Sequence, residues 1–223
     1  MNLPPPVIRH ILLEENKNID IKDQVFFQTG NDGVHQWESG IVLARFVLWA
    51  ENLHGKILEL GSGSGLAGIT CSKYRNFEEV VLTDYNERVI ANMTENAALN
   101  HARVSIKYMD WTNASTYLDT RFDFIIGSDL IYDGAPIREL IRTIAAHLAQ
   151  TGSCYIIMPN KRKMTPVFIT EIEQAGLQVE SSPLLDERYR ESPSENKAQG
   201  YRDFIELQLH TYILYTIKFN NLE

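Results

Sequence analysis

Short apolar runs alternate with longer stretches of helical spacing along most of this chain. Short runs that are rich in β-branched or aromatic residues and bounded by glycine or polar residues are typical of buried strands. Such runs predict strands over Ile57–Leu60, Val80–Thr83, Val104–Tyr108, Phe122–Gly127 and Tyr155–Met158. The stretches between them predict helices over Leu66–Tyr74, Asn86–Asn100, Pro136–Leu148 and Met164–Ala175.

The ends of these stretches carry residues that begin or end helices. Asn86 is a favourable N-cap, Pro136 suits a first helical turn, and Gly176 suits the position after a last turn. Further upstream, Trp37–Leu53 has apolar residues three and four positions apart, which predicts an amphipathic helix. Strands that alternate with helices indicate βαβ units, and therefore a mostly parallel sheet with helices on both faces.

The two ends of the chain do not follow this alternation of strands and helices. Leu177–Glu180 and Thr211–Phe219 predict two more strands. They complete a seven-stranded, Rossmann-like α/β sheet, with an antiparallel strand at the C-terminal edge. Between them, residues 185–201 are charged and contain Ser192-Pro193-Ser194, which predicts a flexible loop. Residues 1–30 form an N-terminal extension, in which Ile19–Ile21 and Val25–Gln28 predict an extra strand pair.

Composition limits the classes of function. A chain of 223 residues with 44% apolar residues is expected to form a single domain over residues 1–223, and we expect a monomer. The net charge of −8 argues against nucleic acid as the main partner. No segment is apolar enough to predict a membrane partner. Cys71 and Cys154 lie in apolar contexts, which predicts buried free thiols in a reducing, cytoplasmic compartment. The histidines lack metal-ligand spacing, so no metal is expected.

A glycine-rich loop, Glu59-Leu60-Gly61-Ser62-Gly63-Ser64-Gly65, directly follows the first strand of the alternating region. Glycine at alternate positions lets a ligand approach the backbone closely. At the carboxyl end of a strand, this predicts a site for a nucleotide-like cofactor. The spacing G-x-G-x-G differs from the dinucleotide pattern G-x-G-x-x-G, and the loop lacks the Lys-Ser/Thr pair of a phosphate-binding P-loop.

Polar and aromatic residues follow the next strands at the same predicted edge of the sheet. Asp84, 19 residues beyond Gly65, suits hydrogen bonds to ribose hydroxyls. Asp110 is followed by Trp111, a pair that suits a purine with an exocyclic amine. Asp129 places a carboxylate at the mouth of the crevice. The basic run Asn160–Lys163, after the fifth strand, is expected to be a solvated surface cluster.

These motifs resemble a known family. E-x-G-x-G-x-G with an acid at the second strand end is similar to the seven-stranded S-adenosylmethionine-dependent methyltransferases. Trp37, LELGSGSGLAG, Asp110-Trp111 and the D-x-x-Y pair Asp129 and Tyr132 resemble, more narrowly, the family-16 protein-lysine methyltransferases. The resemblance covers roughly residues 33–176. It implies S-adenosyl-L-methionine as cofactor and, as partner, a lysine-bearing protein substrate such as an elongation factor or a chaperone.

The resemblance also implies roles for single residues. Gly61, Ser62 and Gly63 would pass under the methionine moiety and the ribose, and Glu59 would support this loop. Asp84 would bind the ribose hydroxyls.

The remaining cofactor contacts implied by the resemblance come from other strand ends. Trp111 would neighbour the adenine, with Asp110 as a partner of its amine. Ser128 would line the pocket through its backbone. Trp37 would close the cofactor from the amino-terminal side.

Asp129 and Tyr132 would face the incoming lysine. A carboxylate stabilises an ammonium, so we assign Asp129 to recognition and orientation rather than to general base chemistry. Tyr132 would orient the amine or offer a cation–π face. Three alternatives stay open: a methyltransferase for a small molecule or nucleic acid, a cofactor-binding protein without activity, and an NAD-dependent oxidoreductase, against which the glycine spacing weighs. Each of these site residues also has a purely structural alternative.

Overall fold

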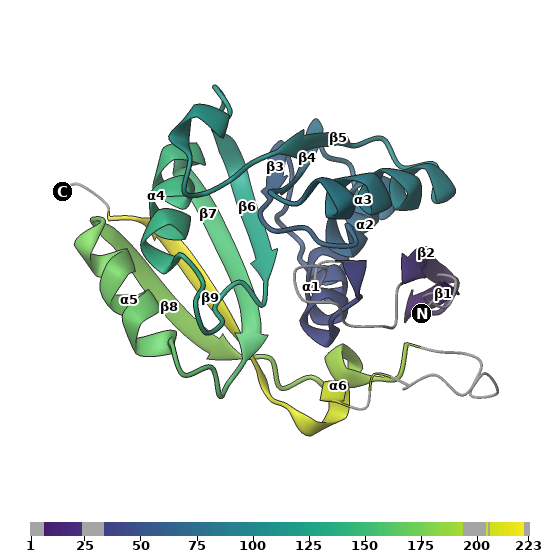
Figure 1. Cartoon of the computed structure of the whole chain (residues 1–223). Helices are drawn as coiled ribbons and strands as arrows, with labels where there is room; N and C mark the ends of the chain where they lie inside the picture. Colours follow the sequence, from purple (N-terminus) through teal and green to yellow (C-terminus); the bar gives the residue numbers. More distant parts are fainter. Residues whose placement is uncertain (1–6, 24–33, 194–203, 205, 221–223) are drawn as a thin grey trace, which may run out of the picture.

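A seven-stranded sheet and a separate two-stranded hairpin form the framework of the molecule (Figure 1). The computed structural model describes residues 7–23, 34–193, 204 and 206–220. The hairpin is β1 (Val7–Glu14) and β2 (Lys17–Asp23). The large sheet contains β3 (Lys56–Glu59), β4 (Glu79–Asp84), β5 (Ser105–Tyr108), β6 (Phe122–Ser128), β7 (Leu148–Pro159), β8 (Leu177–Pro183) and β9 (Tyr212–Phe219).

The five longer helices occur where the apolar spacing predicts them, with ends that differ by a few residues, whereas this spacing does not predict the short α6. They are α1 (Glu38–Trp49), α2 (Leu66–Tyr74), α3 (Glu87–Leu99), α4 (Ile137–His147), α5 (Thr165–Gln174) and the short α6 (Glu206–Leu209), with 3-10 turns η2 (Ala114–Thr116) and η3 (Glu187–Arg190). Asn86 caps α3 as predicted, because its side-chain oxygen accepts the Arg88 N–H at 3.0 Å. Gly176 follows α5 with a φ of +74°.

The sheet order is β5-β4-β3-β6-β7-β9-β8, which confirms the Rossmann-like α/β fold. The first five strands in this order are parallel, and β9 is antiparallel to both of its neighbours. The predicted antiparallel C-terminal strand therefore exists, but its expected place at the edge is corrected, since β8 occupies the edge. The crossover from β7 through α5 to β8 leaves one position open, and β9 fills it by pairing on both sides.

Two helical layers cover the sheet (Figure 1). Neighbouring residues of the central strands point to opposite layers: Ile57 and Ile126 pack in the cluster with α1 and α2, whereas Leu58 and Ile125 pack in the cluster with α4. The strand order reverses between β3 and β6, where the connections leave toward opposite faces. In open α/β sheets this reversal marks the crevice in which ligands bind.

The N-terminal hairpin differs in part from the prediction. Ile19–Ile21 does lie in a strand, β2, but its partner is β1, and Val25–Gln28 lies outside the described residues. Asn16 adopts a left-handed conformation with a φ of +64° at the turn, which asparagine tolerates well. Ile11 and Leu13 alternate into the core, a short pattern within a charged segment.

Three asparagines of α3 and its C-cap satisfy the outer edge of β2. The Asn92 amide donates to the Lys22 carbonyl, and the Asn96 oxygen accepts the Lys22 N–H at 2.8 Å. Asn100 accepts the N–H of Asp20 at 2.9 Å and donates to its carbonyl at 2.7 Å. These residues are spaced four apart, so one face of the helix replaces a neighbouring strand for β2.

Arg45 of α1 holds the β1 side of the hairpin. The residue is 2% exposed. Its guanidinium donates to the carbonyls of Leu12, Leu13, Tyr189 and Glu191. Pro193 adds a backbone bond, accepting the Leu12 N–H at 2.8 Å. The first part of the predicted flexible loop is therefore docked against the hairpin, while residues 194–201 lie outside the described residues. The single-domain organisation stays a prediction.

Candidate functional site

The glycine loop joins β3 to α2 in a left-handed backbone conformation. Gly61, Gly63 and Gly65 have φ values of +57°, +54° and +83°. A Cβ on Gly61 would lie 2.8 Å from the Leu130 side chain and 3.4 Å from the Trp111 ring. Only glycine satisfies both conditions, since it has no Cβ and adopts positive φ without strain. The loop thus forms a narrow cradle of main chain beneath an indole, which fits a flat, nucleoside-containing cofactor.

Ser62 ties the glycine loop to the end of β4. Its N–H donates to the Thr83 carbonyl at 2.9 Å, and its hydroxyl accepts the Thr83 N–H at 3.0 Å. The Thr83 hydroxyl in turn donates to the Glu59 carbonyl at 2.7 Å. The ends of the two strands are therefore locked together, and the side chain of Ser62 is used within the protein.

Glu59 supports the loop from below. It is 4% exposed, and its carboxylate accepts the Gly68 N–H at 2.9 Å. A Cβ on Gly68 would lie 2.8 Å from that carboxylate oxygen, so glycine is needed for the close approach. Burial raises the pKa of the Glu59 carboxyl to about 8, although the hydrogen bond from Gly68 acts in the opposite direction.

Asp84 ends β4 directly beside the loop. One carboxylate oxygen accepts the Gly63 N–H at 3.3 Å, and the other accepts the Asn86 N–H at 3.0 Å. Burial raises the pKa of this carboxyl, and the backbone hydrogen bonds lower it. Asp84 therefore shapes the turn into α3 and also places a carboxylate at the glycine loop.

Asp110 and Trp111 follow β5 and contribute differently to the site. The Trp111 ring lies against Gly61, at the centre of the cradle. Asp110 uses one carboxylate oxygen within its own turn, accepting the Thr112 N–H at 2.9 Å and the Thr112 hydroxyl at 2.7 Å. The structure thus brings Trp111 onto the loop, whereas Asp110 stabilises the turn that carries it.

The start of α1 forms the amino-terminal side of the site. Trp37 is the N-cap residue of α1 and remains partly exposed. Gln36, which the sequence analysis missed, is buried and links this wall to the cradle: it donates to the Trp37 carbonyl at 2.7 Å and accepts the Ser64 hydroxyl. No spacing or motif marks Gln36, because its partners are brought together only by the fold. Ser128 also belongs here, since its hydroxyl would lie 3.7 Å from a Cβ on Gly40 of α1.

A buried carboxylate of the hairpin supports this wall from behind. Asp23 pairs with Arg9, and its other oxygen lies 3.1 Å from the His35 ring nitrogen and accepts the Gln36 N–H at 3.2 Å. The His35 ring packs edge-on against Trp37 with centroids 5.1 Å apart. Contacts thus run continuously from the hairpin to the residue expected to close the cofactor site.

Asp129 follows β6 and is held on two sides. Its backbone is left-handed, with a φ of +56°, and its N–H donates to the Ile157 carbonyl at 2.9 Å. Both carboxylate oxygens accept hydrogen bonds from the Arg162 guanidinium: Oδ1 from Nε at 2.7 Å, and Oδ2 from the terminal nitrogen. Burial raises the pKa of Asp129, and the pair with Arg162 lowers it. Lys161 and Lys163 are exposed as predicted, but Arg162 is not merely solvated.

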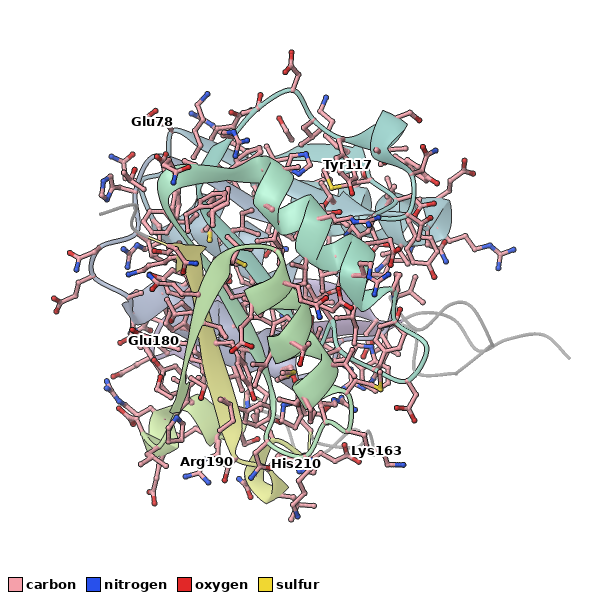
Figure 2. The ribbon with its side chains drawn as sticks, turned by 90° about the vertical axis from the view of Figure 1, so that its left-hand side faces the viewer. Glu78, Tyr117, Lys163, Glu180, Arg190 and His210 are labelled. Carbon is pink, nitrogen blue, oxygen red and sulfur yellow. The ribbon has the colours of Figure 1, made fainter. Side chains whose placement is uncertain are left out.

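Further ionisable groups surround Asp129. Glu38 of α1 and Glu206 of α6 interact electrostatically with each other, and Glu38 also interacts with Asp129, so that burial and both carboxylates raise the pKa of Glu38. His210 lies 3.9 Å from Glu206 and also faces Asp129. Figure 2 shows His210 and Lys163 at the same edge of the molecule, opposite Glu78. Asp129 therefore sits in a cluster with more acidic than basic side chains.

Tyr132 lies three residues beyond Asp129 and is 46% exposed. Its carbonyl accepts the Ala135 N–H at 3.0 Å in the turn that leads to α4.

Among the residues that the structure describes, no group of three histidine, cysteine, aspartate or glutamate side chains is arranged to hold a metal ion. Within the same residues, no helix has the length and apolarity needed to cross a membrane.

Residues 13–175 match the family model described as lysine methyltransferase. The chain belongs to the lysine methyltransferase family. The match includes α1, the glycine loop, Asp84, Trp111, Asp129 and Tyr132, whereas Glu206 and His210 near Asp129 lie beyond the matched residues.

Curated relatives of this chain are named for different acceptors. The histidine protein methyltransferase 1 homolog of Dictyostelium discoideum is 35% identical over 131 residues, covering 56% of this chain and 42% of the relative. Protein-lysine N-methyltransferase EFM2 of Saccharomyces cerevisiae is 26% identical, covering 88% and 53%. Protein N-lysine methyltransferase METTL21A of Xenopus tropicalis is 30% identical, covering 66% and 68%. The chain spans about half the length of the first two relatives.

Solved structures agree on the fold. The glycopeptide N-methyltransferase MtfA, in complex with S-adenosyl-L-methionine, has a TM-score of 0.60 at 14% identity and covers 82% of this chain and 95% of its own. At this identity the likeness concerns the fold alone.

Proposed function

We propose that this lysine methyltransferase family member is an S-adenosylmethionine-dependent protein-lysine N-methyltransferase. The observation that carries the proposal is the carboxylate of Asp129, which lies with Glu38 and Glu206 at the edge of the sheet that also bears the glycine cradle. A cluster with excess negative charge attracts a cationic side chain. Tyr132, three residues away and partly exposed, offers an aromatic wall for it.

The residues around the cradle fit S-adenosyl-L-methionine. Gly61 and Gly63 present main chain to the methionine moiety and the ribose, and Asp84 presents a carboxylate for the ribose hydroxyls. Trp111 provides a face for the adenine, and Asp110 has a second carboxylate oxygen for the adenine amine. When bound, the cofactor supplies a methyl group on a sulfonium, from which a neutral thioether leaves readily.

The other proposed contacts complete the cofactor site. Glu59 and Ser62 act through the loop, because their side chains hold its backbone in place. Ser128 lines the site through its backbone, and Trp37 closes it from the start of α1.

The protein's contribution to methyl transfer is then mainly alignment. Holding two reactants in a reactive geometry is worth about 7–11 kcal/mol. The acceptor amine must also be neutral, because an ammonium has no lone pair to form the new bond. A lysine amine has an ordinary pKa of about 10.4 and is therefore mostly protonated at neutral pH. Asp129 orients the amine and Tyr132 faces it, while the proton leaves to solvent.

We further propose a protein partner, with an elongation factor or a chaperone as the substrate class, and a monomer that acts in the cytoplasm. The net charge of −8 supports a protein partner over nucleic acid or a membrane surface. Cys71 and Cys154 are buried free thiols, which supports a reducing compartment.

The proposal is tested by incubating the protein with labelled S-adenosyl-L-methionine and a cell lysate, with and without nuclease. One labelled protein band that survives nuclease is expected. Mass spectrometry of that band should find methyllysine; methylhistidine, the product suggested by the name of the Dictyostelium relative, would contradict the lysine assignment. Loss of the label with nuclease would move the proposal to a nucleic-acid substrate.

Two variants separate the proposed roles within the site. Asp129→Ala should abolish labelling and leave cofactor affinity, measured by calorimetry, within a few-fold. Asp84→Ala should instead weaken cofactor binding by about tenfold or more, because a charge-assisted hydrogen bond is worth about 1.5–3 kcal/mol. Loss of cofactor binding in the Asp129 variant would remove that residue from the acceptor side of the site.

A further inference from the structure

Arg162 occupies the carboxylate that is proposed to receive the acceptor lysine. Its Nε donates to Asp129 Oδ1 at 2.7 Å, and a terminal nitrogen donates to Oδ2. The side chain of Asp129 is 15% exposed and that of Arg162 36% exposed, so the pair is only partly screened by water. A bidentate, charge-assisted pair of this kind is among the stronger polar contacts in proteins.

The pair of Arg162 and Asp129 affects the protonation state of the acceptor amine, and methyl transfer requires the unprotonated amine. The amine lone pair must form the new bond to the methyl carbon as the bond from that carbon to sulfur breaks and its electrons pass to sulfur. An ammonium has no lone pair for this step, so its proton must leave to solvent first. A lone carboxylate beside the amine favours the ammonium and therefore opposes the reaction.

We propose that Arg162 stays paired with Asp129 during methyl transfer and acts as a positioning residue, which lets Asp129 hydrogen-bond the acceptor amine without holding its proton. This inference rests on the proposed function. Arg162 neutralises the charge of Asp129, and its own positive charge disfavours the ammonium form of a nearby amine. The carboxylate keeps its value as an acceptor that orients the nitrogen.

The geometry leaves room for both partners on Asp129. A carboxylate has about four lone-pair sites, and the guanidinium uses one on each oxygen. The backbone N–H of Asp129 bonds to Ile157 at the end of β7, and Arg162 lies in the loop that follows the same strand. Since β7 and its loop hold both the backbone and the side chain of Asp129, an incoming lysine would have to break two preformed bonds to displace the guanidinium.

Other ionisable groups face the same point. Asp129 and Glu206 of α6 both act on Glu38 of α1, and His210 acts on Asp129. The three acids, together with Arg162, act on Tyr212 of β9. The two glutamates supply attraction for a cation. All of these groups remain in a variant in which only Arg162 is changed. A difference in acceptor ionisation between the native protein and that variant therefore reports on Arg162.

The test is the pH dependence of kcat/KM for Arg162→Gln, with the lysate protein that the native enzyme labels as acceptor. Removing the guanidinium leaves Asp129 charged and raises the pKa of the acceptor amine. The rising limb of the profile should move to higher pH by about one unit, which is about a tenfold loss of rate near neutral pH. Cofactor affinity should stay within a few-fold. Lys161→Gln is the matched control: it removes an exposed positive charge from the same loop and should leave the limb in place.

Two results would overturn the inference. An unchanged limb would show that Arg162 has no influence on acceptor ionisation. A gain in kcat/KM near neutral pH would show that the lysine displaces Arg162, which would then be a competitor for Asp129. Arg162→Met, which keeps an unbranched stem, replaces the Gln variant if that variant is unstable. Failure of the native enzyme to label any protein would instead contradict the proposed function.

Discussion

Glu59 is a single buried carboxyl that links the stability of the glycine loop to pH. Burial raises its pKa from 4.5 to about 8, so the folded protein binds a proton that the unfolded chain releases. The stabilisation that results is fully present below pH 4.5 and is lost as pH rises toward 8. A difference of one bound proton changes the free energy of unfolding by about 1.4 kcal/mol per pH unit.

Glu59→Gln tests this dependence, because its amide oxygen still accepts the Gly68 N–H but does not titrate. The free energy of unfolding of the variant, minus that of the native protein, should increase by about 1 kcal/mol per unit between about pH 5 and pH 7. Urea unfolding at several pH values measures it. Asp84 titrates in both proteins and largely cancels in the difference. A difference that is constant with pH would mean that Glu59 is ionised throughout in the folded state.

The site residues differ in whether a short sequence motif identifies them. The glycines, Asp84 and the Asp129–Tyr132 pair belong to short motifs at strand ends, so sequence alone predicts them. Arg162 meets Asp129 from 33 residues away, across the ends of two strands. A basic run carries no sign of such a partner, and so its contact with Asp129 could not be predicted.

At the scale of elements, the asparagines of α3 hold the N-terminal hairpin beside the glycine loop. Asn96 is fully buried and bonds both to the Lys22 N–H of β2 and, at 2.9 Å, to the Ser64 carbonyl of the glycine loop. Asn96→Ala leaves both backbone groups without these partners. The expected loss of stability in urea unfolding is about 2–4 kcal/mol, the cost of burying unsatisfied polar groups.

Thr94 on the same helix is the matched control for this variant. Among the described residues, its exposed hydroxyl bonds to the Ile90 carbonyl of its own helix alone, so Thr94→Ala should change stability by about 0.5 kcal/mol or less. Equal losses in the two variants would mean that the helix itself, rather than its contact with β2, sets the stability of this region.

The elements themselves were largely predictable because their signals are local. Periodicity and end residues such as Asn86 and Gly176 locate the helices, and apolar runs locate the strands of the large sheet. Pairing is different: β9 enters between β7 and β8, and β2 pairs with β1, because each strand chooses among several partners in three dimensions. The apolar pattern specifies which residues form a strand but not which neighbour completes it.

At the scale of the whole molecule, Arg45 joins parts of the chain that are far apart in sequence. It lies on α1 and bonds to carbonyls of β1 and of the segment around η3, more than 140 residues later. Burial lowers its pKa to about 10, so it remains charged at neutral pH. A buried charge is tolerated when each of its nitrogens donates a hydrogen bond, as here, but the carbonyl partners depend on it.

Arg45→Met keeps the apolar stem and removes all four hydrogen bonds. We expect a loss of about 3 kcal/mol or more, and cleavage by a protease near Tyr189 under conditions that leave the native protein intact, since this segment then opens without global unfolding. Arg138→Met is the control, because Arg138 forms an exposed ion pair with Glu171 and such pairs contribute little to stability. Cleavage near Tyr189 at the same rate in both variants would show that the hydrophobic contact of Trp49 and Tyr189, whose ring centroids are 5.0 Å apart, suffices to dock the segment.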